Sequence, residues 1–272
     1  MGHHYIPRAY LRHFASAADP ERVWMYDKKT RKKRHSLIKE VAQKPRFYRS
    51  DVESSLNTNV ELPGTLAMIQ LLRGVFLSNG EREDLSRYIA TMIKRVPYHR
   101  NYVNTTLYPE LLARTTREYR EKLRMLETQF AIPAGIVDLK LAETDTAEKK
   151  LLGNMPNDVR QIIEDPRPQT TAPDPVSAHF ASFHWRVFKC SGPSFFLTTD
   201  NPVYRYAELI FPLSSTHCLH GDPQRPGESL AFSNVDEKKV RGINRKTVGH
   251  AERYVYYNED VEWIQKLLKR RE

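Results

Sequence analysis

The sequence contains only two cysteines among its 272 residues, Cys190 and Cys218. There is no CxxC pair and no cysteine cluster, so neither a zinc ribbon nor a disulfide framework is expected. No apolar run approaches the roughly 18 residues of a membrane span, and the N-terminus lacks the apolar core of a signal peptide. We therefore expect a protein of a reducing compartment, the cytoplasm, without a membrane partner.

The familiar signatures of catalytic chemistry are also missing. The chain has no GxSxG elbow, no GxxxxGK[ST] phosphate loop, no HExxH helix and no Rossmann glycine fingerprint. A serine or cysteine nucleophile triad finds no support, because neither cysteine lies in a polar motif. Any activity must come from a less familiar set of residues.

The composition is that of a globular, basic protein. Hydrophobic residues make up 40% of the chain, enough for a core in one large domain or two small ones. Lysine and arginine number 43 against 33 acidic residues, a net charge of +10. This favours an anionic partner such as nucleic acid or a nucleotide. The basic residues are scattered, however, and a solvated surface explains much of the excess.

The most informative stretch is the N-terminal segment from His3 to Phe14. Pro7 suits the first turn of a helix, so a short helix is predicted from about Pro7 to Ala15. The segment also carries large apolar side chains that we expect to be buried: Tyr5, Ile6, Tyr10, Leu11 and Phe14. An N-terminus with this pattern is predicted to be ordered and docked onto the rest of the chain.

His3, His4 and Arg8 surround the start of this predicted helix. The exposed N-H groups of a helix start favour a phosphate or carboxylate there. Neutral imidazoles can instead bind a metal ion. Because consecutive side chains diverge, one histidine is expected to contact ligand and the other to hold position. The alternative is that both histidines only cap and pack.

A β-hairpin is predicted from two strand-like runs, residues 22–27 and 34–38. The polar run between them makes a strongly basic tip, whose candidate nucleic-acid contacts are Lys28, Lys29, Lys32 and Lys33. Hairpin tips are usually charged because they are solvated, and this second interpretation is the favoured one.

Two helices are predicted next, at residues 51–72 and 81–95. The first has a break or kink at Pro63-Gly64. Glu61 stands just before that break, where its carboxylate either projects into a cleft or lies exposed on the helix.

Arg95 and Arg100 flank Pro97 at the end of the second predicted helix. An arginine at a helix C-terminus complements the helix dipole, which is a purely structural role. Two arginines and His99 around one proline can equally form a fork for a carboxylate or phosphate. The sequence leaves both roles open.

The middle of the chain is predicted to be scaffold. Residues 101–132 have the pattern of one long amphipathic helix with its apolar stripe inward. Weaker patterns predict short helices at 147–152 and 157–164. A Pro-rich connector follows at residues 165–175, the place for an internal boundary or mobile loop.

Strand-like runs dominate the rest of the chain. The predicted strands are 182–190, 194–199, 208–213, 229–232 and 253–257, with helices at 236–244 and 259–271. We therefore expect an α+β protein with a helical N-terminal half that contains a β-hairpin and a mainly antiparallel sheet in the C-terminal half. It is predicted to be a single domain over residues 1–272, with a mostly helical subregion, 1–165, and a mostly β subregion, 176–272.

Asp200 and Asn201 follow the end of the predicted strand Ser194 to Thr199. A buried strand that delivers two polar side chains at its end is a common way to place them rigidly in a site. An Asx turn that reverses the chain before Pro202 explains the same residues equally well.

Taken together, these motifs resemble a prokaryotic family called domain of unknown function 4238. The resemblance rests on the opening His-His-Tyr-Ile-Pro-Arg-x-Tyr-Leu-x-x-Phe, on Arg-x-Pro-x-x-Arg, on Thr-Asp-Asn-Pro-Val and on Phe-Pro-Leu-Ser, and it extends from His3 to about Tyr257. It implies that these residues fall on signature positions: His3, His4, Pro7, Arg95, Arg100, Asp200, Asn201 and Pro202. Glu61 is a looser match.

Polar signature residues from four distant segments are expected to form one composite pocket. The leading hypothesis is a metal-dependent phosphoesterase or nuclease acting on nucleic acid or a nucleotide. Its catalytic candidates are His3, His4, Glu61 and Asp200, with Asp200 and Glu61 as ligands of Mg²⁺ or Mn²⁺ and with Arg8, Arg95, Arg100 and Asn201 binding the substrate. The alternative is a non-catalytic module that binds nucleic acid or a nucleotide.

Overall fold

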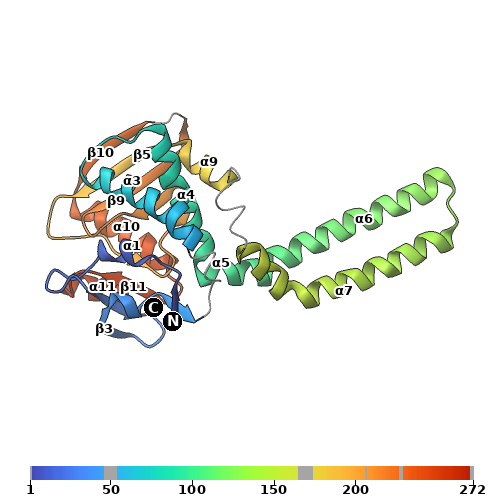
Figure 1. Cartoon of the computed structure of the whole chain (residues 1–272), viewed down its shortest axis with the longest axis horizontal. Coiled ribbons are helices and arrows are strands. Elements are labelled where there is room, and N and C mark those ends of the chain that lie inside the picture. Colours follow the sequence, from blue (N-terminus) through green and yellow to red (C-terminus); the bar gives the residue numbers. More distant parts are fainter. Residues whose placement is uncertain (1, 46–53, 165–173, 206, 227–228, 270–272) are drawn as a thin grey trace. The chain divides into compact units, whose positions relative to one another are not determined.

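The chain folds as an α+β protein, in agreement with the class predicted from sequence. The computed structural model describes residues 2–45, 54–164, 174–205, 207–226 and 229–269 (Figure 1). The chain divides into two compact units: unit 1 comprises residues 1–96 and 166–272, and unit 2 comprises residues 97–165. Residues 165–173 of the expected connector lie outside the described residues. A helix with the length and apolar character of a membrane span does not occur among the residues described.

The N-terminal segment is docked into unit 1, as predicted. β1 (Gly2–His4) pairs antiparallel with β4 (Gln43–Pro45), and α1 (Arg8–Arg12) follows. The helix is shorter than expected, because Pro7 is extended and lies just outside it. The five apolar side chains expected to be buried are at most 5% exposed: Tyr5, Ile6, Tyr10, Leu11 and Phe14.

The predicted hairpin is present and belongs to a four-stranded antiparallel sheet with the order β3-β2-β11-β6. Its members are β2 (Arg22–Asp27), β3 (Lys32–Leu37), β6 (Thr198–Thr199) and β11 (Tyr254–Tyr257). A short 3-10 helix, η1 (Ile38–Glu40), follows the hairpin. The N-terminal hairpin therefore pairs with the end of the chain, and the C-terminal helix α11 (Glu262–Lys269) packs on the same core.

A five-stranded sheet in the order β10-β5-β9-β8-β7 forms the other half of unit 1. Its members are β5 (Phe183–Cys190), β7 (Tyr204–Arg205), β8 (Leu209–Pro212), β9 (His217–Pro226) and β10 (Leu230–Val235). β10 and β5 are parallel, whereas the other neighbours are antiparallel, so the sheet is mixed rather than uniformly antiparallel.

The central strand β9 was not predicted from sequence. Its composition includes Gly221 and prolines, which are depleted in strands. Gly221 is needed here because a Cβ atom on it would lie 2.9 Å from Phe183 and 3.0 Å from Leu209 on the neighbouring strands. Close packing between strands thus overrides local strand propensity.

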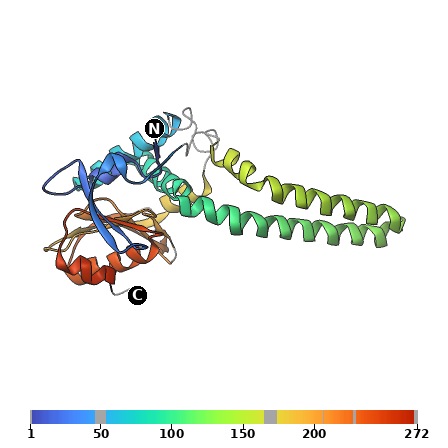
Figure 2. The same cartoon turned by 90° about the horizontal axis from the view of Figure 1, so that it is seen from below.

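Helices cover both faces of this sheet (Figure 2). The helices α3 (Leu62–Leu72), α4 (Asn79–Arg95) and α9 (Pro175–Ala181) pack together. Tyr88 of α4 contacts Phe211 of β8. On the opposite face, α10 (Glu237–His250) packs Val240 and Ile243 against Ile210. Alternate residues of β8 therefore face different helices, as the pleat of a strand requires.

Of the break or kink predicted at Pro63-Gly64, the break is absent, because the helix continues through Pro63. Residues 54–56 are helical, and the π-helix η2 (Asn57–Glu61) leads directly into α3. The Leu62 N-H bonds to the Asn57 oxygen, five residues back, so the wider turn accommodates the proline that follows. Residues 51–53 of the predicted helix lie outside the described residues.

Unit 2 is a pair of antiparallel helices, side by side in both views (Figures 1 and 2). Its elements are α5 (Pro97–Tyr102), the π-helix η3 (Val103–Leu107), α6 (Tyr108–Phe130) and α7 (Ala134–Glu164). The two short helices expected after residue 133 are one 31-residue helix. Part of the apolar stripe expected to face inward on residues 101–132 is exposed: Tyr119 is 45% and Phe130 64% exposed. A two-helix pair shields only the narrow seam between its helices.

The remaining differences concern element ends. The helix expected at 236–244 continues to His250, because the apolar spacing persists through Val248. Asp236 caps its start. Only Thr198–Thr199 of the expected strand 194–199 pairs in a sheet. Phe196 instead bonds through its N-H to the Ser215 oxygen, and Leu197 to the side chain of Asn244.

Candidate functional site

His4 is fixed at the end of β1 by main-chain pairing with Gln43. Its ring Nδ1 lies 3.2 Å from the carbonyl oxygen of Val41. A carbonyl only accepts, so Nδ1 carries the proton and the neutral ring presents Nε2 as a lone-pair acceptor. Burial is the main cause that lowers the pKa of His4, and the charge of Arg8 lowers it further. His4 is therefore a neutral base at pH 7.

Arg95 joins His4 to Glu61. On the last turn of α4, its Nη2 donates to the main-chain oxygen of His4 at 2.7 Å. Its Nη1 forms an ion pair with Glu61, the last residue of the π-helix η2. The Arg95 side chain is only 3% exposed. The structure thus brings together three predicted site residues from three distant segments.

Arg8 and His3 lie next to this cluster. Arg8 is the exposed first residue of α1. Its charge reaches His4, as the lowered pKa of His4 shows. His3 is half-buried opposite Lys44 in the β1–β4 pair, and the alternation along a strand directs it away from His4. That one of the two histidines contacts a ligand while the other holds position stays a prediction.

Asp200 and Asn201 bind the main chain that enters β11. The Asp200 carboxylate accepts hydrogen bonds from three consecutive N-H groups, those of Glu252, Arg253 and Tyr254, at 2.8–2.9 Å. Asn201 Nδ2 lies 3.4 Å from the carbonyl oxygen of His250. Both side chains are 4% exposed. The two residues hold a loop in place, a structural role of the kind that the sequence left open.

The same environment sets the ionisation of Asp200. Burial raises its pKa to about 6, although the three N-H groups act in the opposite direction. The Asp200 charge also adds to burial in raising the pKa of Tyr5, so the ring of Tyr5 lies near this carboxylate. Two adjacent residues of the N-terminal segment therefore contact different clusters. The main-chain oxygen of His4 is bonded to Arg95, and the ring of Tyr5 lies near Asp200.

The two carboxylates expected to bind a metal ion have partners within the chain. Both oxygens of Asp200 are occupied by main-chain N-H groups, and Glu61 is paired with Arg95. Within the described ranges, no group of three or more histidine, cysteine, aspartate or glutamate side chains is arranged to hold a metal ion. A metal ion held by Asp200 and Glu61 stays a prediction.

The hairpin lysines have different surroundings. Lys28 Nζ donates to the carbonyl oxygens of Val248 and Ala251, at 3.2 and 2.7 Å, at the end of α10. Lys33 forms an ion pair with Asp260. Lys29 and Lys32 are exposed. Only part of the predicted basic tip is thus directed to solvent. Arg100 belongs to α5 in unit 2, and a common pocket with Arg95 stays a prediction.

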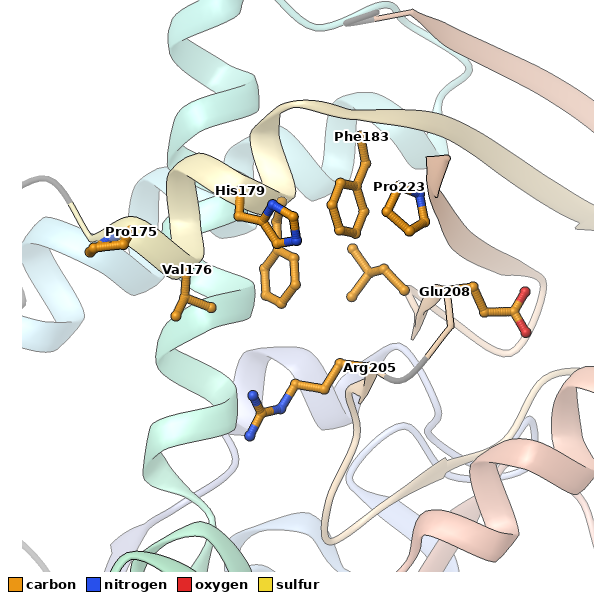
Figure 3. Close-up of a pocket in the computed structure, with 9 residues that line it drawn as sticks. Pro175, Val176, His179, Phe183, Arg205, Glu208 and Pro223 are labelled. Carbon is orange, nitrogen blue, oxygen red and sulfur yellow. The ribbon is translucent and has the colours of Figure 1, made fainter. Parts of the chain in front are cut away.

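A pocket of about 380 Å³ lies beside α9 and was not predicted from sequence. Figure 3 shows the rings of His179, Phe183 and Pro223 near one another, with Arg205 across from them. The Phe183 ring stands edge-on to His179 at 4.6 Å between centroids. Glu208 also lines this pocket, so its charged lining carries both signs. The only sequence signal was the aromatic spacing Phe180-x-x-Phe183 after the Pro-rich connector.

Comparison with known proteins identifies the family but no characterised relative. Neither the curated proteins nor the solved structures contain a match to this chain. The family model described as "Protein of unknown function (DUF4238)" matches residues 2–261. Since that match covers nearly the whole chain, including the His4 cluster and the Asp200 loop, the protein belongs to the DUF4238 family.

Proposed function

We propose that the protein is a hydrolase that cleaves phosphoesters in nucleic acid or a nucleotide, with His4 as its proton-transfer residue. The observation that supports this most directly is the state of His4. Its Nδ1 is held by the Val41 carbonyl and its pKa lies below the ordinary value. A neutral imidazole with Nε2 as acceptor is the form that a general base requires at pH 7.

The residues around His4 have distinct roles in this proposal. His4 Nε2 takes a proton from a water molecule, the water oxygen attacks phosphorus, and the P-O bond to the leaving group breaks. The leaving oxygen takes a proton from solvent. Arg8, exposed next to His4, compensates the negative charge of the phosphate. Arg95 and Glu61 position the main chain of His4 and do not themselves contact the substrate.

Asp200 and Asn201 have no chemical role in the proposal, because their polar atoms are bonded to the chain. Glu61 is likewise engaged by Arg95 and is assigned no metal. The net charge of +10 supports an anionic substrate, although it does not distinguish nucleic acid from a nucleotide.

The test is hydrolysis of DNA, RNA and nucleotides by the full chain, with Mg²⁺, with Mn²⁺ and with a chelator. His4→Ala should abolish turnover and leave the melting temperature nearly unchanged. His13→Ala is the matched control, since His13 is a half-buried histidine in the same segment whose pKa is also lowered by burial. A parent protein that cleaves none of these substrates, or equal activity in both variants, would contradict the proposal.

The second candidate is a non-catalytic module that binds nucleic acid or a nucleotide. The exposed Lys29 and Lys32 at the hairpin tip favour it. The two candidates differ in one measurement. A binding module retains its affinity in His4→Ala and has no turnover to lose, whereas the hydrolase loses turnover while it still binds.

A further inference from the structure

A second pocket, of about 410 Å³, lies between α10 and the strands β8 and β9 of the five-stranded sheet. Most of its charged lining comes from a single helix. Lys238 and Lys239 stand one turn before Gly242, and Arg245 and Lys246 follow it by one turn. Residues spaced by three or four positions share one face of a helix, so these four basic side chains surround the glycine.

The acidic side chains in this pocket are already bonded. Asp236 caps α10 and accepts the Lys239 N-H at 2.8 Å. Glu208 accepts from Lys246 and lies 2.6 Å from His220 Nε2. Burial acts to raise the pKa of Glu208, but the bonds from Lys246 and His220 outweigh it and keep the pKa below its ordinary value. The carboxylate therefore stays ionised and committed to these two partners.

Three of the cations have no acidic partner among the described residues. Lys238, Lys239 and Arg245 form no ion pair with any carboxylate in the part of the chain that the structure describes. The Lys239 ammonium lies 5.2 Å from the centre of the Phe188 ring, which fixes its direction without neutralising it. The pocket thus keeps an excess of positive charge.

Gly242 supplies an independent observation. A glycine in a helix interior destabilises the helix relative to alanine. At Gly64 a tight contact explains the glycine, because a Cβ atom would overlap Tyr88. At Gly242, as at Gly80, Gly135 and Gly153, nothing outside the local helix backbone lies within 4 Å of where a Cβ would be. Packing within the chain therefore does not require a glycine at this position. Because Gly242 has no side chain, the pocket stays open between the four basic residues.

We infer that this pocket binds a small phosphorylated molecule, with its phosphate over Gly242 and between the lysines of α10. The volume is in the range of small-molecule sites, about 300–1,000 Å³, and a concave site favours a compact ligand over an extended backbone. Ammonium groups suit phosphate as point charges. The site shares no residue with the His4 cluster, so it does not depend on the proposed hydrolase activity.

The experiment is calorimetric titration of the full chain with inorganic phosphate, pyrophosphate and adenosine monophosphate. Lys238→Gln with Lys239→Gln should weaken binding by about tenfold or more, since a hydrogen bond to a charged group contributes about that factor. The matched control is Lys149→Gln with Lys150→Gln, which removes the same charge from two adjacent exposed lysines on α7.

The variant Gly242→Leu tests the open space of the pocket independently of its charge. The leucine side chain fills the open space, so binding should be lost while all four basic residues remain. Leucine is also a better helix former, so the melting temperature should hold or rise. Gly242→Ala, a smaller change, should weaken binding less.

Three results would overturn the inference. They are no binding of any of the three probes, equal binding in Gly242→Leu and the parent, and binding of nucleic acid alone that depends on Lys238 and Lys239.

Discussion

The Nη2 of Arg95 donates a hydrogen bond of 2.7 Å to the main-chain oxygen of His4, ninety-one residues earlier in the chain. Through this bond the end of α4 determines where the N-terminal strand lies. Glu61 holds the other side of the same guanidinium. The position of His4 therefore depends on a buried ion pair between two helices that are distant from it in sequence.

Replacing Arg95 with methionine should lower the free energy of unfolding by about 3 kcal/mol, since it leaves the mostly buried Glu61 carboxylate without its partner. Chemical denaturation measures this change. The double variant Arg95→Met with Glu61→Leu should recover much of the loss, because no unpaired charge remains. If the double variant is less stable than the single one, the ion pair is not the cause.

Arg87→Met on the same helix is the matched control. Arg87 also pairs with a carboxylate, that of Asp84 at 3.4 Å, but both side chains are about a third exposed. Surface pairs contribute little, so stability should change by less than about 1 kcal/mol. Equal losses at Arg87 and Arg95 would show that burial of the pair does not matter.

The hydrolase proposal predicts an acid limb in the pH–rate profile. A general base must be neutral, so the rate falls as pH drops through the pKa of His4. Burial places that pKa below the ordinary value near 6.5, and the limb should lie below about pH 6.5. Arg8→Gln removes a nearby positive charge and should move the limb upward. A limb that stays in place would mean that His4 does not control it.

Asp200 should give a stability that falls with rising pH. Its folded pKa of about 6 exceeds the ordinary aspartate value, so folding favours the protonated form. The contribution is fully present below about pH 4 and is lost by about pH 6, a change of about 3 kcal/mol. The difference in unfolding free energy between the parent and Asp200→Asn isolates it. A difference that grows with pH over this range would instead show that the three N-H groups outweigh burial.

The sequence predicted those elements that are determined by local patterns and missed those that are determined by contacts with distant parts of the chain. The N-terminal core and the β2–β3 hairpin follow from local apolar and turn patterns, and both were predicted. β9 was missed because the packing of Gly221 against Phe183 and Leu209, rather than its own composition, makes it a strand.

The site shows the same limit. Proximity of His4, Glu61 and Arg95 was expected because the family resemblance places His4 and Arg95 on signature positions, with Glu61 as a looser match. The role of Asp200 was not decided by sequence, since its three donors belong to residues more than fifty positions later. Local patterns identify polar candidates, but tertiary partners determine whether a carboxylate is free for chemistry.

The hairpin lysines should separate into two functional kinds. If the tip binds nucleic acid, Lys29→Gln with Lys32→Gln should reduce the slope of log affinity against log salt by about two, one for each phosphate contact. Lys28→Gln should instead lower the melting temperature, because Lys28 binds the carbonyl oxygens that end α10. Unchanged salt dependence in the double variant would rule out the tip as a contact surface.

The N-terminal segment should be indispensable for folding. Deleting residues 1–14 removes five fully buried apolar side chains, each of which contributes about 1.5–3 kcal/mol. Their sum, about 7.5–15 kcal/mol, is comparable to the whole stability of a typical domain, about 5–15 kcal/mol, so the truncated chain should be insoluble or unfolded. A milder test is Tyr10→Phe. The Tyr10 hydroxyl donates to the Pro212 oxygen at 2.7 Å and lies 2.8 Å from Thr198 Oγ1, so its loss should cost about 1–3 kcal/mol. Tyr119→Phe, at a half-exposed position of α6, should change stability by less than about 0.5 kcal/mol. A truncated protein with the parent's melting temperature would show that the segment only rests on the surface.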